Sequence, residues 1–85
     1  MNLKASNLHV FLQLADGVDD ETWEFHRKNH DYSNWVRARI KDEELADELA
    51  KVEGIKAKPT DTRAAVRAAI EARYTLPTDA ASGQV

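Results

Sequence analysis

Two histidines stand at a spacing that zinc sites use. His26 and His30 are four residues apart, so on a continuous helix both imidazoles would lie on one face. The zinc protease pattern requires a glutamate directly after the first histidine as general base, and Arg27 occupies that position. Asn29 is expected to end the helix, although Asp31 follows as a candidate third ligand. We therefore predict no metal and no other cofactor, with His26 at a cap or lining the core and His30 in a turn.

Hydroxyl groups and carboxylates lack a catalytic arrangement. The candidate nucleophiles are Ser6, Thr22, Ser33, Thr60 and Thr62. None lies in a glycine-rich nucleophile elbow, and helix starts offer each a simpler capping role. Carboxylates concentrate at residues 19–21 and 42–44, where the positive end of a helix dipole accounts for them. We predict that the chain is not an enzyme.

Charge is distributed in two consecutive blocks of opposite sign. From Arg27 to Lys41 the net charge is +4, and from Asp42 to Glu53 it is −5. Such blocks either neutralise each other across solvated faces or form a charged docking surface. We favour the docking surface, because short helices need their apolar stripes for the core and leave many charges outside.

The docking surface would bind a protein partner or a second copy of the chain. Its predicted residues are Arg37, Arg39, Lys41, Glu44 and Glu48. An antiparallel two-fold contact would place the basic segment of each copy against the acidic segment of the other. Nucleic-acid binding through a helix at 32–40 is the alternative, which a net charge of −3 disfavours.

Two further residue pairs are candidate contact sites. Trp23 and Phe25 point about 200° apart on a helix, so both cannot enter one small core, and one is expected to be exposed for a partner. Arg63 and Arg67, four residues apart, could together hold a phosphate or a carboxylate. Ordinary solvent-exposed arginines on an alanine-rich helix are the alternative.

These residues require helices to position them. Helical periodicity and cap residues predict helices at 8–15, 20–28, 32–40, 43–53 and 62–74. The expected N-caps are, in chain order, Asp19, Asp31 or Ser33, Asp42, and Thr60 or Asp61. Gly54 is expected in the left-handed conformation after the fourth helix. Residues 8–15 also alternate as a strand would, but no partner strand is evident.

Length and composition limit the architecture. With 85 residues the chain can form one core, so we predict an all-α compact bundle of four to five short helices over residues 1–77, with a disordered tail at 78–85. The absence of cysteine fits a reducing cytoplasm. No apolar run approaches the length of about 20 residues that a membrane span needs, so we expect no contact with membranes.

A family resemblance rests on three sequence motifs. After His26 come Asp-Tyr-x-x-Trp at residues 31–35, Ile-x-Asp-x-x-Leu-Ala at 40–46 and Arg-Ala-Ala-Ile-Glu-Ala-Arg-Tyr-Thr-Leu-Pro at 67–77. These motifs resemble small prokaryotic helical domains of uncharacterised function, and they are similar to C-terminal extensions of some phosphatases of the haloacid dehalogenase class. The resemblance implies an accessory or interaction module. The Asp-x-Asp-x-Thr nucleophile motif is missing, so no phosphatase activity or catalytic residue carries over.

The sequence therefore predicts a non-catalytic helical protein-interaction or regulatory accessory module, with self-association as its specific form. A nucleic-acid-binding helical domain and a small-ligand or metal-binding domain are the alternatives.

Overall fold

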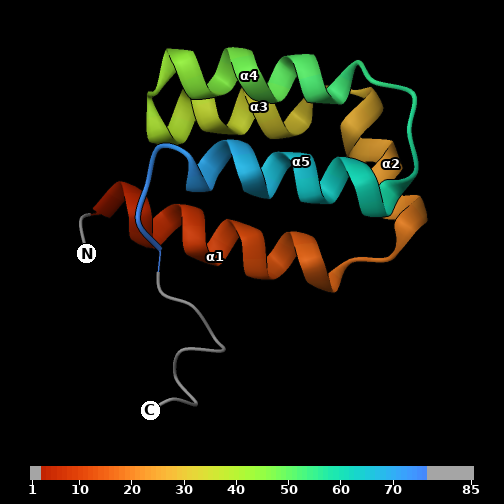
Figure 1. The fold of residues 1–85 in the computed structure, drawn as a ribbon, viewed down its shortest axis with the longest axis horizontal. Coiled ribbons are helices and arrows are strands. Elements are labelled where there is room, and N and C mark those ends of the chain that lie inside the picture. Colours follow the sequence, from red (N-terminus) through yellow and green to blue (C-terminus); the bar gives the residue numbers. More distant parts are fainter. Residues whose placement is uncertain (1–2, 77–85) are drawn as a thin grey trace.

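The computed structural model describes residues 3–76, which form five α-helices and one short π-helix (Figure 1). They are α1 (Leu3–Gly17), α2 (Asp20–Lys28), α3 (Asp31–Trp35), the π-helix η1 (Val36–Ile40), α4 (Glu43–Glu53) and α5 (Pro59–Glu71). The described residues contain no strand, so the predicted all-α class is confirmed and the strand alternative for residues 8–15 is wrong. The predicted disorder at 78–85 lies outside this range.

α5 contacts α1, α2 and α4, and α1 also contacts η1 directly. In Figure 1, α5 lies between α1 on one side and α3 and α4 on the other, and α2 crosses one end of the bundle. The core consists of Leu8, Leu12, Ala15, Trp23, Tyr32, Val36, Ile40, Leu45, Ala46, Leu49, Val66 and Ile70. No helix in the described part of the chain is long and apolar enough to cross a membrane.

Aromatic rings supply much of this core, as a chain with few large aliphatic residues requires. Trp23 stacks on Tyr32 with ring centroids 4.3 Å apart, and its indole nitrogen donates a hydrogen bond of 2.8 Å to the hydroxyl of Thr62. Phe11 stacks on the half-buried Trp35 with centroids 4.9 Å apart. These contacts join four helices through side chains that are distant in the sequence.

The two aspartate caps are confirmed. Asp19 accepts from the backbone N–H of Thr22 at 2.8 Å, and Asp42 accepts from the N–H of Leu45 at 3.0 Å. The hydrogen bonds with Thr22 are the main cause that lowers the pKa of Asp19 below its ordinary value. Both caps follow from local chemistry, because the acceptor and the free amide are three residues apart.

The predictions for the fifth helix start and for Gly54 are wrong. α5 begins at Pro59, whose fixed φ suits the first helical turn, so Thr60 and Asp61 lie inside that turn. Gly54 has a φ of −84°, in the right-handed region. Its N–H bonds to the carbonyls of Ala50 and Lys51, so the last turn of α4 tightens without a left-handed residue.

A residue from another helix takes the place of the predicted cap of α3. Neither Asp31 nor Ser33 caps it; the preceding residue, His30, is left-handed with a φ of 57° and makes no side-chain cap bond. The buried carboxylate of Glu53, at the end of α4, accepts from the N–H of Tyr32 at 2.9 Å and of Ser33 at 3.2 Å. The start of α3 is therefore capped from a position about 20 residues away.

Arg27 completes this junction from α2. Its buried guanidinium donates to the carbonyl of Glu53 at 2.6 Å and to that of Ile55 at 3.3 Å, while Glu24 binds its other edge. The hydrogen bonds that Arg27 donates to Glu24 are the main cause that lowers the pKa of Glu24. Because carbonyls at a helix end lack intrahelical donors, Arg27 satisfies groups that burial would otherwise leave unpaired.

The predicted helix over 32–40 does not stay α-helical to its end. Residues 36–40 form a π-helix, which the N–H of Lys41 closes on the carbonyl of Val36 at 2.8 Å. Lys41 itself is left-handed, with a φ of 61°, and the chain turns at once into α4. Val36 and Ile40 remain buried, so the wider turn keeps both in the core.

Removing the carboxylate of Glu53 should destabilise the domain strongly. Glu53→Ala leaves two amides of α3 buried without an acceptor, and we expect a loss of about 3 kcal/mol in the free energy of unfolding, measured by urea denaturation. Glu48→Ala on the same helix is the control and should change it by less than about 0.5 kcal/mol. Equal losses in both variants would show that the buried carboxylate is not the anchor of α3.

Candidate functional site

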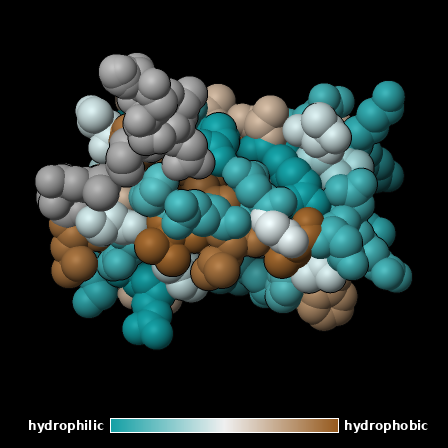
Figure 2. Space-filling model, turned by 90° about the horizontal axis from the view of Figure 1, so that it is seen from below, coloured by the Kyte–Doolittle hydropathy of each residue, from teal (hydrophilic) through white to brown (hydrophobic). Residues whose placement is uncertain are grey.

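Helix α1 presents apolar side chains on both of its faces. Its inner face buries Ala5, Leu8, Leu12 and Ala15. On the opposite face Leu3, Val10 and Leu14 fall within about 40° of arc and are 75%, 51% and 68% exposed. Figure 2, which views the molecule from the α1 side, shows hydrophobic surface on this face with hydrophilic side chains around it. We call Leu3, Val10 and Leu14 the outer face of α1.

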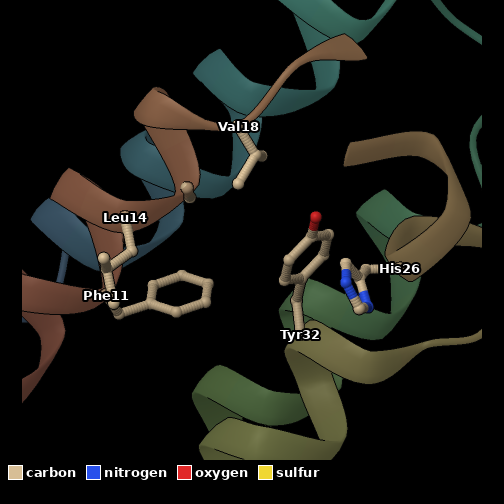
Figure 3. Close-up of a pocket in the computed structure, with 6 residues that line it drawn as sticks. Phe11, Leu14, Val18, His26 and Tyr32 are labelled. Carbon is tan, nitrogen blue, oxygen red and sulfur yellow. The ribbon is translucent and has the colours of Figure 1, made fainter. Parts of the chain in front are cut away.

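A pocket adjoins the outer face where α1 meets α2 and α3. Its volume is about 130 Å³, and it is lined by Phe11, Leu14, Ala15, Val18, His26 and Tyr32. In Figure 3, Phe11 and Leu14 project from α1 across the pocket from Tyr32 and His26, and Val18 closes one side. An apolar cavity of about 150 Å³ holds one benzene ring, so this pocket has room for one aromatic or branched aliphatic group.

His26 gives the pocket a polar edge. Its Nδ1 lies 2.8 Å from Oδ2 of Asp31, and an ionised carboxylate can only accept, so Nδ1 carries the hydrogen. The other polar group of the lining, the hydroxyl of Tyr32, donates to the carbonyl of Trp23 at 3.1 Å. None of the six lining residues is a serine, threonine or cysteine that His26 could activate. The arrangement can orient a ligand or a partner side chain but supplies no nucleophile.

Of the two aromatic residues of α2, one is buried and the other is exposed, as the helical spacing requires. Trp23 is 1% exposed and belongs to the core, so it drops out of the predicted partner-binding residues. Phe25 is 61% exposed, and its ring lies at the edge of the His26 ring, with centroids 5.2 Å apart. The exposed member of the pair is therefore Phe25.

The predicted charged docking surface is partly neutralised within the molecule. Arg37 pairs with Glu43 and also with Asp47, at 3.2 Å, both on α4. These carboxylates raise the pKa of Arg37, mainly through the hydrogen bonds that Arg37 donates to Glu43 and then to Asp47. Glu48 lies 3.4 Å from Lys51.

Three other members of that predicted surface remain solvated. Arg39, Lys41 and Glu44 are exposed, and no ion pair joins them to another side chain between residues 3 and 76. The structure thus brings the two charge blocks together across α3, η1 and α4, where they bind each other at Arg37.

The predicted anion site at Arg63 and Arg67 is occupied by groups of the same chain. Arg63 donates to the carbonyls of Ala15, at 2.5 Å, and Val18, at 2.9 Å. It also pairs with Asp20 at 3.0 Å, and its guanidinium carbon lies 5.0 Å from the centroid of the Trp23 ring. Arg67 pairs with Asp16 and Glu71. Both arginines hold α5 against α1, because Arg63 binds the carbonyl of Ala15 and Arg67 binds the carboxylate of Asp16. An external anion would have to displace these groups.

The two histidines of the predicted helical pair separate. His26 faces Asp31 at the pocket, whereas His30 lies beyond the end of α2, with its Nδ1 3.2 Å from Oε1 of Glu53. In residues 3–76 no three His, Cys, Asp or Glu side chains gather as ligands for a metal ion.

The main feature that the sequence analysis missed is the outer face of α1. Its signal was present, because residues 8–15 are apolar almost all round, and a helix with that pattern at the surface of a small bundle must expose part of it. The pocket had no sequence signal, since its lining comes from three separate helices and a loop. No family model, no curated protein and no solved structure matches this chain.

Burial alters the acid chemistry of both tyrosines. Burial is the main cause that raises the pKa of Tyr32 to about 12. Burial also raises the pKa of Tyr74 to about 12, helped by the hydrogen bond of 2.6 Å that its hydroxyl donates to Asp42. The same bond is the main cause that lowers the pKa of Asp42, ahead of the bond from the N–H of Leu45.

Both tyrosines should ionise late and weaken the fold as they do. The unfolded chain releases these protons near pH 10 and the folded chain near pH 12, so the stabilisation is complete below pH 10 and is lost between about pH 10 and 12. We expect phenolate absorbance to rise with a midpoint near pH 12, together with loss of helical circular dichroism. A midpoint near pH 10 with intact helix would contradict the burial of these hydroxyls.

Proposed function

We propose that the protein is a non-catalytic helical protein-interaction or regulatory module of the cytoplasm. Its contact surface is the outer face of α1 together with the adjoining pocket. The observation that carries the proposal is the exposure of Leu3, Val10 and Leu14 on the side of α1 that faces away from the core. Small soluble domains seldom expose an ordered apolar stripe beside a pocket unless another molecule covers it.

The surface suits an apolar helix or short segment as its partner. The residues beside the stripe on α1 include Asn7, Gln13 and Ser6, none of which carries charge. Apolar anchors of the partner would lie along the stripe, and one larger side chain would enter the pocket beside Phe11 and Tyr32. Binding would depend on burial rather than on charge and would persist in high salt.

The alternatives have less support. Nucleic-acid binding through Arg37, Arg39 and Lys41 would require Arg37 to leave Glu43 and Asp47. For a free small ligand, the pocket beside α1 has room for one ring and offers a single polar edge at His26. The resemblance to C-terminal extensions of haloacid dehalogenase-class phosphatases agrees with an accessory role.

The proposal predicts which surface substitutions abolish partner binding. The full chain serves as bait in a lysate of the source organism, and each captured protein is purified and titrated against the bait. The double variant Val10→Ser and Leu14→Ser should weaken its affinity at least about tenfold, since both anchors are lost. Ile55→Ser is the control, because Ile55 is 49% exposed away from α1 and should leave binding unchanged.

Three outcomes would contradict the proposal. The first is a partner that binds the double variant and the Ile55→Ser control equally well, which places the contact elsewhere. The second is that the parent chain captures nothing beyond what the double variant captures. Affinity that falls steeply between 0.05 and 0.5 M salt would likewise oppose an uncharged contact surface.

A further inference from the structure

The outward side of α2 carries one large aromatic side chain. Trp23 and Arg27 point inward and are buried, whereas Phe25 projects from the opposite side and is 61% exposed. Phe25 does not line the pocket beside α1. It is thus an exposed apolar group that does not belong to the outer face of α1, although its ring contacts His26 at the edge of the pocket.

Two opposite charges flank Phe25 on the same side of the helix. Glu21 lies about one turn before Phe25, and Lys28 lies almost one turn after it. Viewed down the helix axis, both are rotated from Phe25 in the same direction, Glu21 by about 40° and Lys28 by about 60°. Along the helix axis the distances from Phe25 are about 6 Å and about 4.5 Å. Both side chains are exposed, and neither forms an ion pair with another residue of the described chain.

This pattern is complementary to itself under one symmetry operation. Consider a two-fold axis that passes between two copies of α2 at Phe25 and is perpendicular to both helix axes. This operation makes the two helices antiparallel, and residues that lie on one side of the contact in the first copy lie on the same side in the second. Glu21 of one copy then lies within about 2 Å, along the helix axis, of Lys28 of the other, because their distances from Phe25 are nearly equal. The operation forms two equivalent ion pairs around a contact between the two Phe25 rings.

We propose that the chain forms a homodimer in which α2 packs antiparallel on α2 of a second copy, with Phe25 at the two-fold axis. Glu21 and Lys28 of each copy pair with Lys28 and Glu21 of the other. This contact replaces the predicted one between the basic and acidic segments, because Arg37 already binds Glu43 and Asp47 within its own chain. The choice of a second copy rests on the charge complementarity of Glu21 and Lys28.

The dimer should be weak and sensitive to salt. α2 has 9 residues, so the contact is far smaller than the roughly 800 Å² per partner of a stable interface, and association should need high protein concentration. Exposed ion pairs are screened by salt, so the association constant should fall as ionic strength rises. The dimer leaves the outer face of α1 open and does not depend on the function proposed for that face.

Charge reversal tests both the contact and its direction. Sedimentation equilibrium of the full chain at low salt should show self-association. Glu21→Lys and Lys28→Glu, each alone, should lower the association constant about tenfold, because each replaces two attractive pairs with two repulsive ones. An equimolar mixture of the two variants should associate at least as tightly as the parent, since only opposite charges then face each other. The double variant should also regain the association of the parent.

Removal of the aromatic ring is the second arm. Phe25→Ser should abolish detectable association, and Ile55→Ser should leave it unchanged. Circular dichroism of every variant should match the parent, because all these side chains are exposed. A parent that stays monomeric at millimolar concentration overturns the proposal. So does association that survives Phe25→Ser, or two reversed variants that fail to associate when mixed. Loss of partner binding in the outer-face variants with an intact dimer would separate the two surfaces.

Discussion

The buried carboxylate of Glu53 is the interaction on which the arrangement of the helices depends. It lies at the end of α4, caps the start of α3 and approaches His30 in the preceding turn. The carbonyl of the same residue accepts from Arg27 and so fixes α2. A buried carboxylate is tolerated only where several groups bind it, and here they come from His30 and the first residues of α3, while Arg27 of α2 binds the backbone carbonyl of the same residue. The orientations of α2 and α3 follow, and with them the positions of Phe25, His26 and the pocket.

The parts of the fold that depend on near neighbours could be predicted from the sequence. Asp19 and Asp42 cap amides three residues away, and the α4 bounds follow from Asp42 and its leucines. The cap of α3 could not be predicted, because nothing in the local pattern shows that Glu53 bonds a turn about 20 residues earlier. The π-helix at 36–40 could not be predicted either, because its buried residues, Val36 and Ile40, have a spacing that fits an α-helix equally well.

The candidate surface was predicted less completely than the fold. Helical geometry indicated that Trp23 and Phe25 must point apart, and packing then decided that Trp23 is the buried one. Charge blocks in the sequence indicated an external partner for Arg37, but the short turn at Lys41 brings α4 alongside and supplies Glu43 and Asp47 instead. A sequence shows where charges are, whereas the tertiary contacts determine which of them remain available to another molecule.

The long reach of the Glu53 cap has a consequence for how the chain emerges during synthesis. A ribosome that has released only residues up to about 50 has produced α1, α2 and the α3 segment, yet the acceptor for the α3 amides is still missing. α1 completes its packing later still, because α5, which packs against its inner face, is the last of the described helices. Until then the inner face of α1 lacks the cover of α5, and its outer face is apolar as well. The described helices therefore cannot reach their final packing one by one as they are made, because the start of α3 needs Glu53 and the inner face of α1 needs α5.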